Sequence, residues 1–400
     1  MRSKPKTGKR CASAPLSPFS EEIRRAWLRL IRTQNIGGVT FWELLAHFGS
    51  AEAALEALPE FAKHGGRISP RDIPKDAAID AELEKAAAAG MTLVAKGEPG
   101  YPPLLAQVEV PPPLLYIKGD AAVWKRPPFA VVGSRQASAA GLKFAADISA
   151  ELGRRGFLIA SGLARGIDAA SHRAALPFAT CAVLPGGLDA IYPPEHAGLA
   201  AEIAEKGLLV SECPPGFVAR AVDFPRRNRI VSGCSLGVAV IEAAERSGSL
   251  ITARLAGEQN REVFAVPGHP LEPRAAGTNR LIKEGAIVAT SADDIVEALA
   301  LQLGALGNLM PASGACMPIP EDPDGSEPAN SVSGNEAGNL GFTGDASGEI
   351  LGLLSLSPID VDELCRISGL EARIVNAALL SLDLSGRIER RGLHQVALRP

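Results

Sequence analysis

The chain has 400 residues, 46% of them hydrophobic and 22% charged, with a formal net charge of −4 at pH 7. This length supplies large cores for about two or three domains, and the charge excludes nucleic-acid binding that relies on overall basicity, so any such binding requires a local patch. The six cysteines form no CxxC pair and no zinc-like spacing with histidine, which predicts a reducing compartment and no structural metal.

Residues 1–18 are predicted to form a disordered basic tail. No signal-peptide hydrophobic stretch follows the basic residues among the first ten. No apolar run in the chain approaches the roughly 18 residues of a membrane span. We therefore expect a cytoplasmic protein with no membrane partner.

Residues 19–90 have the pattern of a small helical domain of the SAM or helix-hairpin-helix kind. Ser20 is the predicted cap of a helix that runs through Trp27. The turn Ile36-Gly37-Gly38-Val39 resembles a helix-hairpin-helix turn, whose backbone N–H groups can face a DNA phosphate. A packing turn inside the domain is the favoured alternative. Two proline-rich stretches, 101–103 and 111–113, predict a rigid approach to the next domain.

Residues 91–300 alternate short apolar strands with helical segments. This pattern predicts an α/β domain, Rossmann-like, with a mostly parallel sheet covered on both faces. The expected strands are 130–132, 157–160, 180–184, 208–211, 237–241, 263–266 and 286–289. Ligands of such sheets bind outside the carboxyl ends of the strands, so the informative residues are those that follow each strand.

The first of these loops is Gly133-Ser134-Arg135, followed by Ser138 as the predicted cap of a helix. Backbone N–H groups, the positive end of a helix dipole and Arg135 together predict an anion site. The alternative is that Gly133 only permits a tight strand–helix turn. The loop lacks the glycines of a dinucleotide fingerprint and the chain has no Walker motif, so no cofactor is predicted.

Four arginines, Arg220, Arg226, Arg227 and Arg229, gather near the same predicted edge, opposed nearby only by Asp223. Arginine forks suit phosphate oxygens and stack on exposed bases, which favours a flexible single strand over a duplex. Phe224 and Tyr192 are candidate stacking residues. The alternative is an ordinary solvated helix face.

Candidate acid and base residues are Asp168, His172, Asp189, Glu242 and Glu245. Asp168 is most simply the cap of a helix, and His172 a packed histidine. Glu242 and Glu245 are positioned to orient arginines. No Ser/His/Asp or Cys/His set follows from local spacing, so no catalytic residue is predicted.

Residues 301–345 are predicted to be a flexible linker, since 311–344 are rich in Pro, Gly, Ser, Asn and acidic residues.

Residues 346–400 resemble a winged helix of three helices and a hairpin. Its presumed recognition helix offers only Glu371, Arg373 and Asn376 as long polar residues, which favours protein contact or auxiliary binding over base reading. Wing arginines Arg387, Arg390 and Arg391 remain candidates for phosphate contact.

The central motifs, taken together and in order, resemble the DNA-processing protein A (DprA/Smf) family. They are Gly133-Ser134-Arg135, the segments 161–168, 189–193 and 224–229, Ser247-Gly248-Ser249, and Val266-Pro267-Gly268. Pro185 and His196 depart from the family's usual residues. The resemblance implies a non-enzymatic mediator that binds single-stranded DNA as a homodimer and helps to load the RecA recombinase during natural transformation. The DNA-contacting residues that it implies are Gly133, Ser134, Arg135, Arg227, Asn228, Arg229, Ser247, Gly248 and Ser249.

Two alternatives stay open. Pro185-Gly186-Gly187 is similar to the loop of nucleotide or phosphoribose hydrolases of a related Rossmann-like fold, although the downstream Gly-Thr and glutamate are missing. The fold could also be a docking platform for which DNA contact is incidental.

Overall fold

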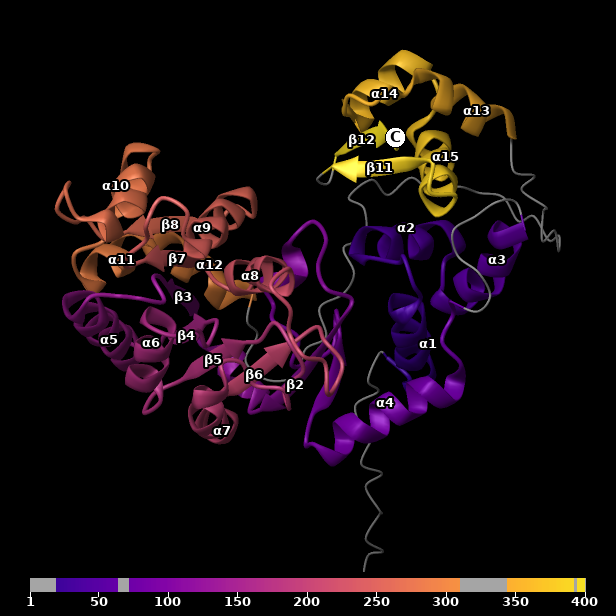
Figure 1. Cartoon of the computed structure of the whole chain (residues 1–400). Coiled ribbons are helices and arrows are strands. Elements are labelled where there is room, and N and C mark those ends of the chain that lie inside the picture. The colour runs from indigo at the N-terminus through magenta and orange to yellow at the C-terminus, as the bar shows by residue number, and fades with distance from the viewer. Residues whose placement is uncertain (1–18, 64–71, 310–343, 392–393, 400) are drawn as a thin grey trace, which may run out of the picture.

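The computed structural model describes residues 19–63, 72–309, 344–391 and 394–399, which form three domains (Figure 1). The α/β domain lies beside the N-terminal helical domain, and the C-terminal winged helix lies over helix α2. Within these described ranges, no helix combines the length and apolar character needed to cross a membrane. The predicted basic tail lies outside the described residues.

The N-terminal domain contains α1 (Glu21–Arg32), α2 (Gly38–Phe48), α3 (Ala51–Lys63) and α4 (Asp76–Ala88). Ser20 Oγ accepts a hydrogen bond from the Ile23 amide at 3.2 Å, which confirms the predicted cap of α1. Trp27 packs edge-to-face against Phe41 and Trp42, with ring centroids 5.2 and 5.4 Å apart. Such pairs add about 0.5–1.5 kcal/mol each beyond the area they bury, so aromatic contacts hold this small core.

The turn before α2 packs against the α/β domain. Gly38 faces Val110, and a Cβ built on Gly38 would lie 3.1 Å from Val110 Cγ1. Trp42 Nε1 donates a hydrogen bond to the Pro111 carbonyl at 2.9 Å. These contacts agree with the packing interpretation of the Ile36–Val39 stretch.

A nine-stranded sheet forms the α/β domain, in the order β1-β2-β6-β5-β4-β3-β7-β8-β9. The adjacent strands in the run β6-β5-β4-β3-β7-β8-β9 are all parallel. Strand β2 pairs antiparallel with both β1 and β6. This confirms the predicted fold class. The strands are β1 (Thr92–Ala95), β2 (Leu114–Gly119), β3 (Pro128–Val132), β4 (Leu158–Ser161), β5 (Thr180–Val183), β6 (Leu208–Ser211), β7 (Gly237–Val240), β8 (Glu262–Ala265) and β9 (Ile287–Val288).

Strands β1 and β2 were not expected, because the prolines around them suggested an approach to the domain rather than part of it. In the structure the proline-rich stretches are built into the fold. Tyr101 is buried, and its hydroxyl donates to the Pro112 carbonyl at 2.6 Å. The antiparallel pair therefore extends the sheet beyond β6.

Helices cover both faces of the sheet. Alternate residues of β3 enter different cores: Phe129 and Val131 pack with α5, α6 and α11, whereas Ala130 and Val132 pack with α8 and α9. The helices are α5 (Ala139–Arg154), α6 (Ile167–Ala175), α7 (Ala197–Lys206), α8 (Asp223–Gly233), α9 (Gly248–Glu258), α10 (Ala276–Lys283), α11 (Ala292–Ala298) and α12 (Ala300–Leu309), with short 3₁₀ helices at Leu105–Gln107, Ala121–Lys125, Pro194–His196 and Pro273–Ala275.

The strand order reverses at β3. From β3 the chain runs outward through β4, β5 and β6, and it then returns to place β7 on the other side of β3. Ligands of open α/β sheets bind at such a switch point, outside the carboxyl ends of the strands. The loops that follow β3 and β7 meet there.

The winged helix contains α13 (Gly344–Leu353), α14 (Val361–Ser368) and α15 (Ala372–Leu384). Its sheet has the order β10-β12-β11, with β10 at Ile359–Asp360, β11 at Ile388–Arg391 and β12 at Gln395–Leu398. The predicted helices and hairpin are therefore present. Helix α12 occupies the beginning of the predicted 301–345 linker, and residues 310–343 lie outside the described residues.

Helix α15 also packs on the N-terminal domain. Leu380 and Leu384 join the hydrophobic core of that domain. Arg390 Nη2 lies 2.6 Å from Glu43 Oε1 of α2, and Arg390 Nε lies 3.6 Å from Asp383 Oδ2. The end of the presumed recognition helix is therefore covered by protein in this structure.

Candidate functional site

The loops after β3 and β4 interlock at the switch point. A Cβ on Gly133 would lie 2.7 Å from Ile167 Cγ1, so this position requires glycine for the loop to pass close to α6. Gly166 has a φ of +75°, and a Cβ there would lie 2.2 Å from the Ser134 carbonyl oxygen. The Ile167 amide donates to that same oxygen at 3.3 Å. This packing presents the next residue, Arg135, to solvent.

Arg135 lies over an aromatic pair. Its Cζ is 5.1 Å from the ring centroid of Phe224, which is itself edge-to-face with Tyr192 at 5.4 Å. Tyr192 is 43% exposed. An exposed cation–π contact contributes about 0.5–1 kcal/mol, so it orients the guanidinium without removing it from solvent. A small cleft here is lined by Arg135, Gly162, Ala164, Arg165, Tyr192, Pro193 and Phe224.

The predicted anion site at the start of α5 is occupied by a side chain of the protein. Glu242, after β7, accepts hydrogen bonds from Ser138 N at 2.9 Å and Ser138 Oγ at 2.5 Å. Ser138 Oγ in turn accepts from Gly141 N at 2.9 Å, which confirms the predicted cap. Glu242 therefore holds a helix N-terminus, where a negative charge is favourable, and the expectation that it orients arginines was wrong. Glu245 is exposed.

The sequence had suggested that Asp168 caps α6, but the structure shows a different role for its carboxylate. Its Oδ2 accepts hydrogen bonds from Gly162 N at 3.1 Å and Ala164 N at 3.3 Å, and Gly166 is the N-cap residue. Asp168 thus ties together the loop after β4. Burial raises its pKa, and the charge of Arg227 opposes that rise.

Arg227 is 6% exposed and lies beneath the loops. Its Nη1 donates to the Val183 carbonyl, and its guanidinium packs against Gly162. Burial lowers the pKa of Arg227 to about 10, which still leaves it charged at neutral pH. The geometry makes Arg227 a buried support of the loops after β4 and β5, whereas the sequence suggested an exposed phosphate ligand.

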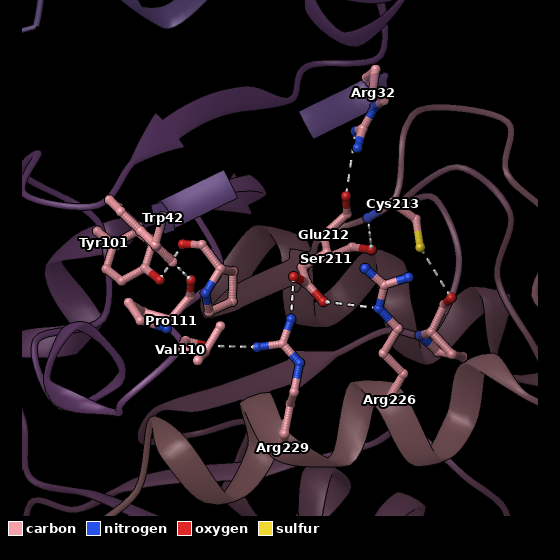
Figure 2. Close-up of polar contacts among 12 residues, drawn as sticks. Arg32, Trp42, Tyr101, Val110, Pro111, Ser211, Glu212, Cys213, Arg226 and Arg229 are labelled. Carbon is pink, nitrogen blue, oxygen red and sulfur yellow. Dashed lines mark hydrogen bonds and ion pairs between the residues drawn. The ribbon is translucent and has the colours of Figure 1, made fainter. Parts of the chain in front are cut away.

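The remaining arginines of the cluster differ in exposure, and Figure 2 shows two of them, Arg226 and Arg229, directed toward Glu212. Arg229 pairs with Glu212 and donates to the Val110 carbonyl at 3.3 Å. Arg226 has a side chain 63% exposed, and its Nε lies 4.0 Å from Glu212 Oε2. The side chain of Arg220 is 72% exposed. Arg226 is therefore both exposed and loosely paired, which places it to reach a phosphate.

The Ser247 turn lies beside α8. Ser247 caps α9, with Ser249 N donating to its Oγ at 3.4 Å, and the two hydroxyl oxygens are 2.7 Å apart. Asn228 Nδ2 donates to the Gly248 carbonyl at 3.3 Å, and Gly248 is exposed. Two of the predicted motifs, Asn228 and the Ser247 turn, are thus brought together.

Other predicted residues serve the framework. Asp189 Oδ1 accepts from Gly216 N at 2.6 Å and so joins the loops after β5 and β6. His172 is fully buried, as expected for a packed histidine, with Nδ1 2.7 Å from Thr180 Oγ1. Burial lowers the pKa of His172 to about 3. Among the described residues, no group of three or more His, Cys, Asp or Glu side chains is placed to hold a metal ion.

The space beside the glycines of the Pro185-Gly186-Gly187 loop is occupied by backbone atoms of the protein. A Cβ on Gly186 would lie 2.8 Å from the Phe217 carbonyl oxygen, and one on Gly187 would lie 2.6 Å from that of Pro214. These glycines admit the loop after β6. This geometry weakens the similarity to a hydrolase phosphate loop.

Sequence reasoning missed Glu212. It directly follows β6, where a polar residue after a buried strand was the signal to look for. Its carboxylate contacts Arg229 and Arg226, and its carbonyl accepts from Arg32 Nη2 at 3.4 Å. One residue therefore links α8 to the helical domain.

Comparisons with known proteins agree with this architecture. The family model described as DNA recombination-mediator protein A matches residues 92–300. A DprA-like N-terminal HHH domain matches residues 21–85, and a DprA winged helix domain matches residues 343–392. All three domains are thus accounted for, in agreement with the resemblance found from the motifs.

Individual relatives cover the chain to different extents. Protein Smf of Escherichia coli is 48% identical over 202 residues, which span 50% of this chain and 54% of that protein. Protein Smf of Synechocystis is 31% identical over 398 residues, covering 91% of this chain and 96% of that protein. The X-ray structure of DNA processing protein A from Streptococcus pneumoniae aligns with a TM-score of 0.62 and 34% identity, covering 68% of this chain and 97% of that chain.

Proposed function

The chain belongs to the DNA recombination-mediator protein A family, and we propose that it binds single-stranded DNA along the loops at the carboxyl edge of its sheet. In this proposal it is a homodimeric mediator in the cytoplasm that protects incoming DNA and helps to load RecA during natural transformation. It acts by binding and performs no catalysis. The family's description as a recombination mediator supports this role.

One observation carries the DNA-binding proposal: exposed Arg135 lies over Phe224, beside exposed Tyr192. A guanidinium fork matches phosphate oxygens, and aromatic side chains stack on bases irrespective of sequence. Bases offer their faces in a single strand, whereas a duplex hides them in its stack. The combination therefore favours a single strand.

The predicted contact residues take two roles in this proposal. Gly133, Ser134, Arg135 and the Ser247-Gly248-Ser249 turn contact the strand. Arg227, Asn228 and Arg229 hold the loops and helix α8 in place, as their contacts with Val183, Gly248 and Glu212 indicate. Exposed Arg226 supplies the phosphate contact that the sequence had suggested for Arg227 and Arg229.

A salt titration tests the proposal. Affinity for an oligothymidylate, measured by fluorescence anisotropy, should fall steeply with salt, and Arg135→Ala should reduce the log–log slope by about one. Lys143→Ala is the matched control, since Lys143 is 77% exposed on α5. If Arg135→Ala combined with Arg226→Ala leaves the affinity unchanged, this edge of the sheet does not bind the strand.

The hydrolase alternative has a separate readout. Release of free base from nucleoside monophosphates, abolished by Glu242→Gln, would support it. The hydrogen bonds from Ser138 to both Glu242 oxygens instead assign this carboxylate to the cap of α5.

A further inference from the structure

We infer that the cavity between α1 and α8 receives a nucleobase of the bound strand. This inference rests on the proposed single-strand binding and deepens it. The cavity measures about 320 Å³ and lies where the helical domain meets the α/β domain. Sites for small molecules measure about 300–1,000 Å³, so the space suits one flat aromatic group.

More than half of the lining residues are apolar, and arginine, acidic and cysteine side chains form the rest of the wall. Ile31 and Ile36 come from the helical domain, and Leu184 and Phe217 come from the loops after β5 and β6. Apolar walls favour the faces of a base, which lose little hydration on burial.

The charged groups around the cavity are mostly committed to one another. Arg32 makes a bidentate contact with Glu82, with its Nε and Nη2 3.0 and 2.9 Å from Oε1. Arg220 contacts Asp223 at 3.4 Å and also lies 5.7 Å from the Phe217 ring centroid. Arg226 is held more loosely, because its nearest acidic atom in Glu212 is 4.0 Å away. We therefore assign to Arg226 the phosphate outside the cavity.

The cavity lies next to the proposed strand site, with buried Arg227 between the two. Within one turn of α8, Phe224 lines the small cleft with Arg135, and Arg226 lines the cavity. Arg227 lies between them, since it lines the cavity and packs against Gly162 of the cleft. A strand that leaves Arg135 across the beginning of α8 thus meets the cavity next. Paired bases of a duplex cannot enter it, so insertion of a base adds selectivity for single strands.

Cys213 provides a reporter within the cavity. Its thiol is half-buried and lies 3.3 Å from the Pro185 carbonyl, and burial raises its pKa. Cys181 and Cys234 are buried, with 0% and 1% exposure. Replacing Cys11, Cys316 and Cys365 with serine leaves Cys213 as the thiol that N-ethylmaleimide can report on in the full-length protein.

The experiment compares two saturating ligands of equal length, an oligothymidylate and an oligomer with abasic sites throughout. Both have the phosphates, but only the first has bases. We expect oligothymidylate to slow the modification of Cys213 about tenfold, in line with the energy of one buried base, and the abasic oligomer to leave the rate nearly unchanged. In addition, Cys213→Trp, which fills the cavity, should weaken binding of oligothymidylate but not of the abasic oligomer.

The outcomes distinguish a failure of the nucleobase inference from a failure of the proposed single-strand binding. Equal protection by both oligomers would show that the backbone covers the cavity, and absence of protection by bound oligothymidylate would show that nothing enters it; either result overturns the inference alone. Failure of oligothymidylate to bind at all would instead overturn the proposed function. Anisotropy recorded on the same samples separates these cases.

Discussion

Glu212 and Arg229 form an ion pair where helix α8 meets the N-terminal domain (Figure 2). Arg229 also donates to the Val110 carbonyl, and Arg32 donates to the Glu212 carbonyl. The pair therefore connects the helical domain, the proline-rich stretch and α8. Helix α8 also carries Phe224 and Arg226, so this junction adjoins the proposed strand site.

Replacing Glu212 with glutamine should destabilise the junction and yet preserve DNA binding. The side chains of Glu212 and Arg229 are 17% and 24% exposed, and loss of a charged hydrogen bond at such a site costs about 1–3 kcal/mol. Removing the negative charge beside Arg226 should leave oligothymidylate affinity equal or higher. Urea unfolding and anisotropy measure the two effects. Glu202→Gln on the exposed side of α7 is the control, and a large loss of affinity for Glu212→Gln would mean that the junction contacts the strand itself.

Phe224→Leu should weaken oligothymidylate binding about tenfold, because a stacked base contributes about 1–3 kcal/mol. The salt slope should stay unchanged, since no phosphate contact is removed. Anisotropy titrations over a range of salt concentrations check both quantities. Phe144→Leu on α5, outside the proposed site, is the matched aromatic control. A changed slope with unchanged affinity would contradict a stacking role for Phe224.

Particular residues show how far the sequence could predict this site. The strands of the parallel sheet and the caps Ser20 and Ser138 follow local rules of pattern and capping, and they were located correctly. The directions of the arginines were not predictable, because neighbours on a helix point about 100° apart and the phase of α8 depends on its packing. Arg226 is consequently exposed while Arg227 is buried.

The role of Glu242 shows a second limit. Its carboxylate caps α5 through Ser138, 104 residues earlier in the chain. No local pattern connects the two. The pairing follows from the return of the chain to β7 beside β3, which brings their carboxyl ends together.

Acid should destabilise the α/β domain through His172. The Thr180 hydroxyl donates to the Ile159 carbonyl at 2.8 Å and so accepts from Nδ1–H of a neutral His172. Because burial lowers the folded-state pKa to about 3, the unfolded chain binds the proton first as the pH falls below about 6.5. Stability should then fall by about 1.4 kcal/mol per pH unit between the two values.

His172→Gln keeps a donor for Thr180 but removes this titration. The free energy of unfolding in urea, measured for both proteins at about pH 7 and about pH 5, isolates the contribution of His172. Arg173→Gln, at the exposed neighbouring position, controls for a local change of charge. Parallel loss of stability in the parent and in His172→Gln would show that other groups dominate.

The winged helix should depend on Arg390 for its docking to α2. Arg390 and Glu43 have side chains only 14% and 23% exposed, so removing one partner leaves a poorly solvated charge. Burial raises the pKa of Glu43 and the charge of Arg390 opposes this rise; Arg390→Ala should therefore raise that pKa further. A double-mutant cycle of Arg390→Ala and Glu43→Gln should give a coupling of about 1–3 kcal/mol.

Hydrogen exchange of α2 measures the docking directly. Arg390→Ala should speed exchange in α2 and at the end of α15, where Leu380 and Leu384 lose their contact with the helical domain. Arg387→Ala, at an exposed position of the same wing, should leave hydrogen exchange in α2 and α15 unchanged. Unchanged exchange in α2 would mean that the two domains are not held together by this ion pair.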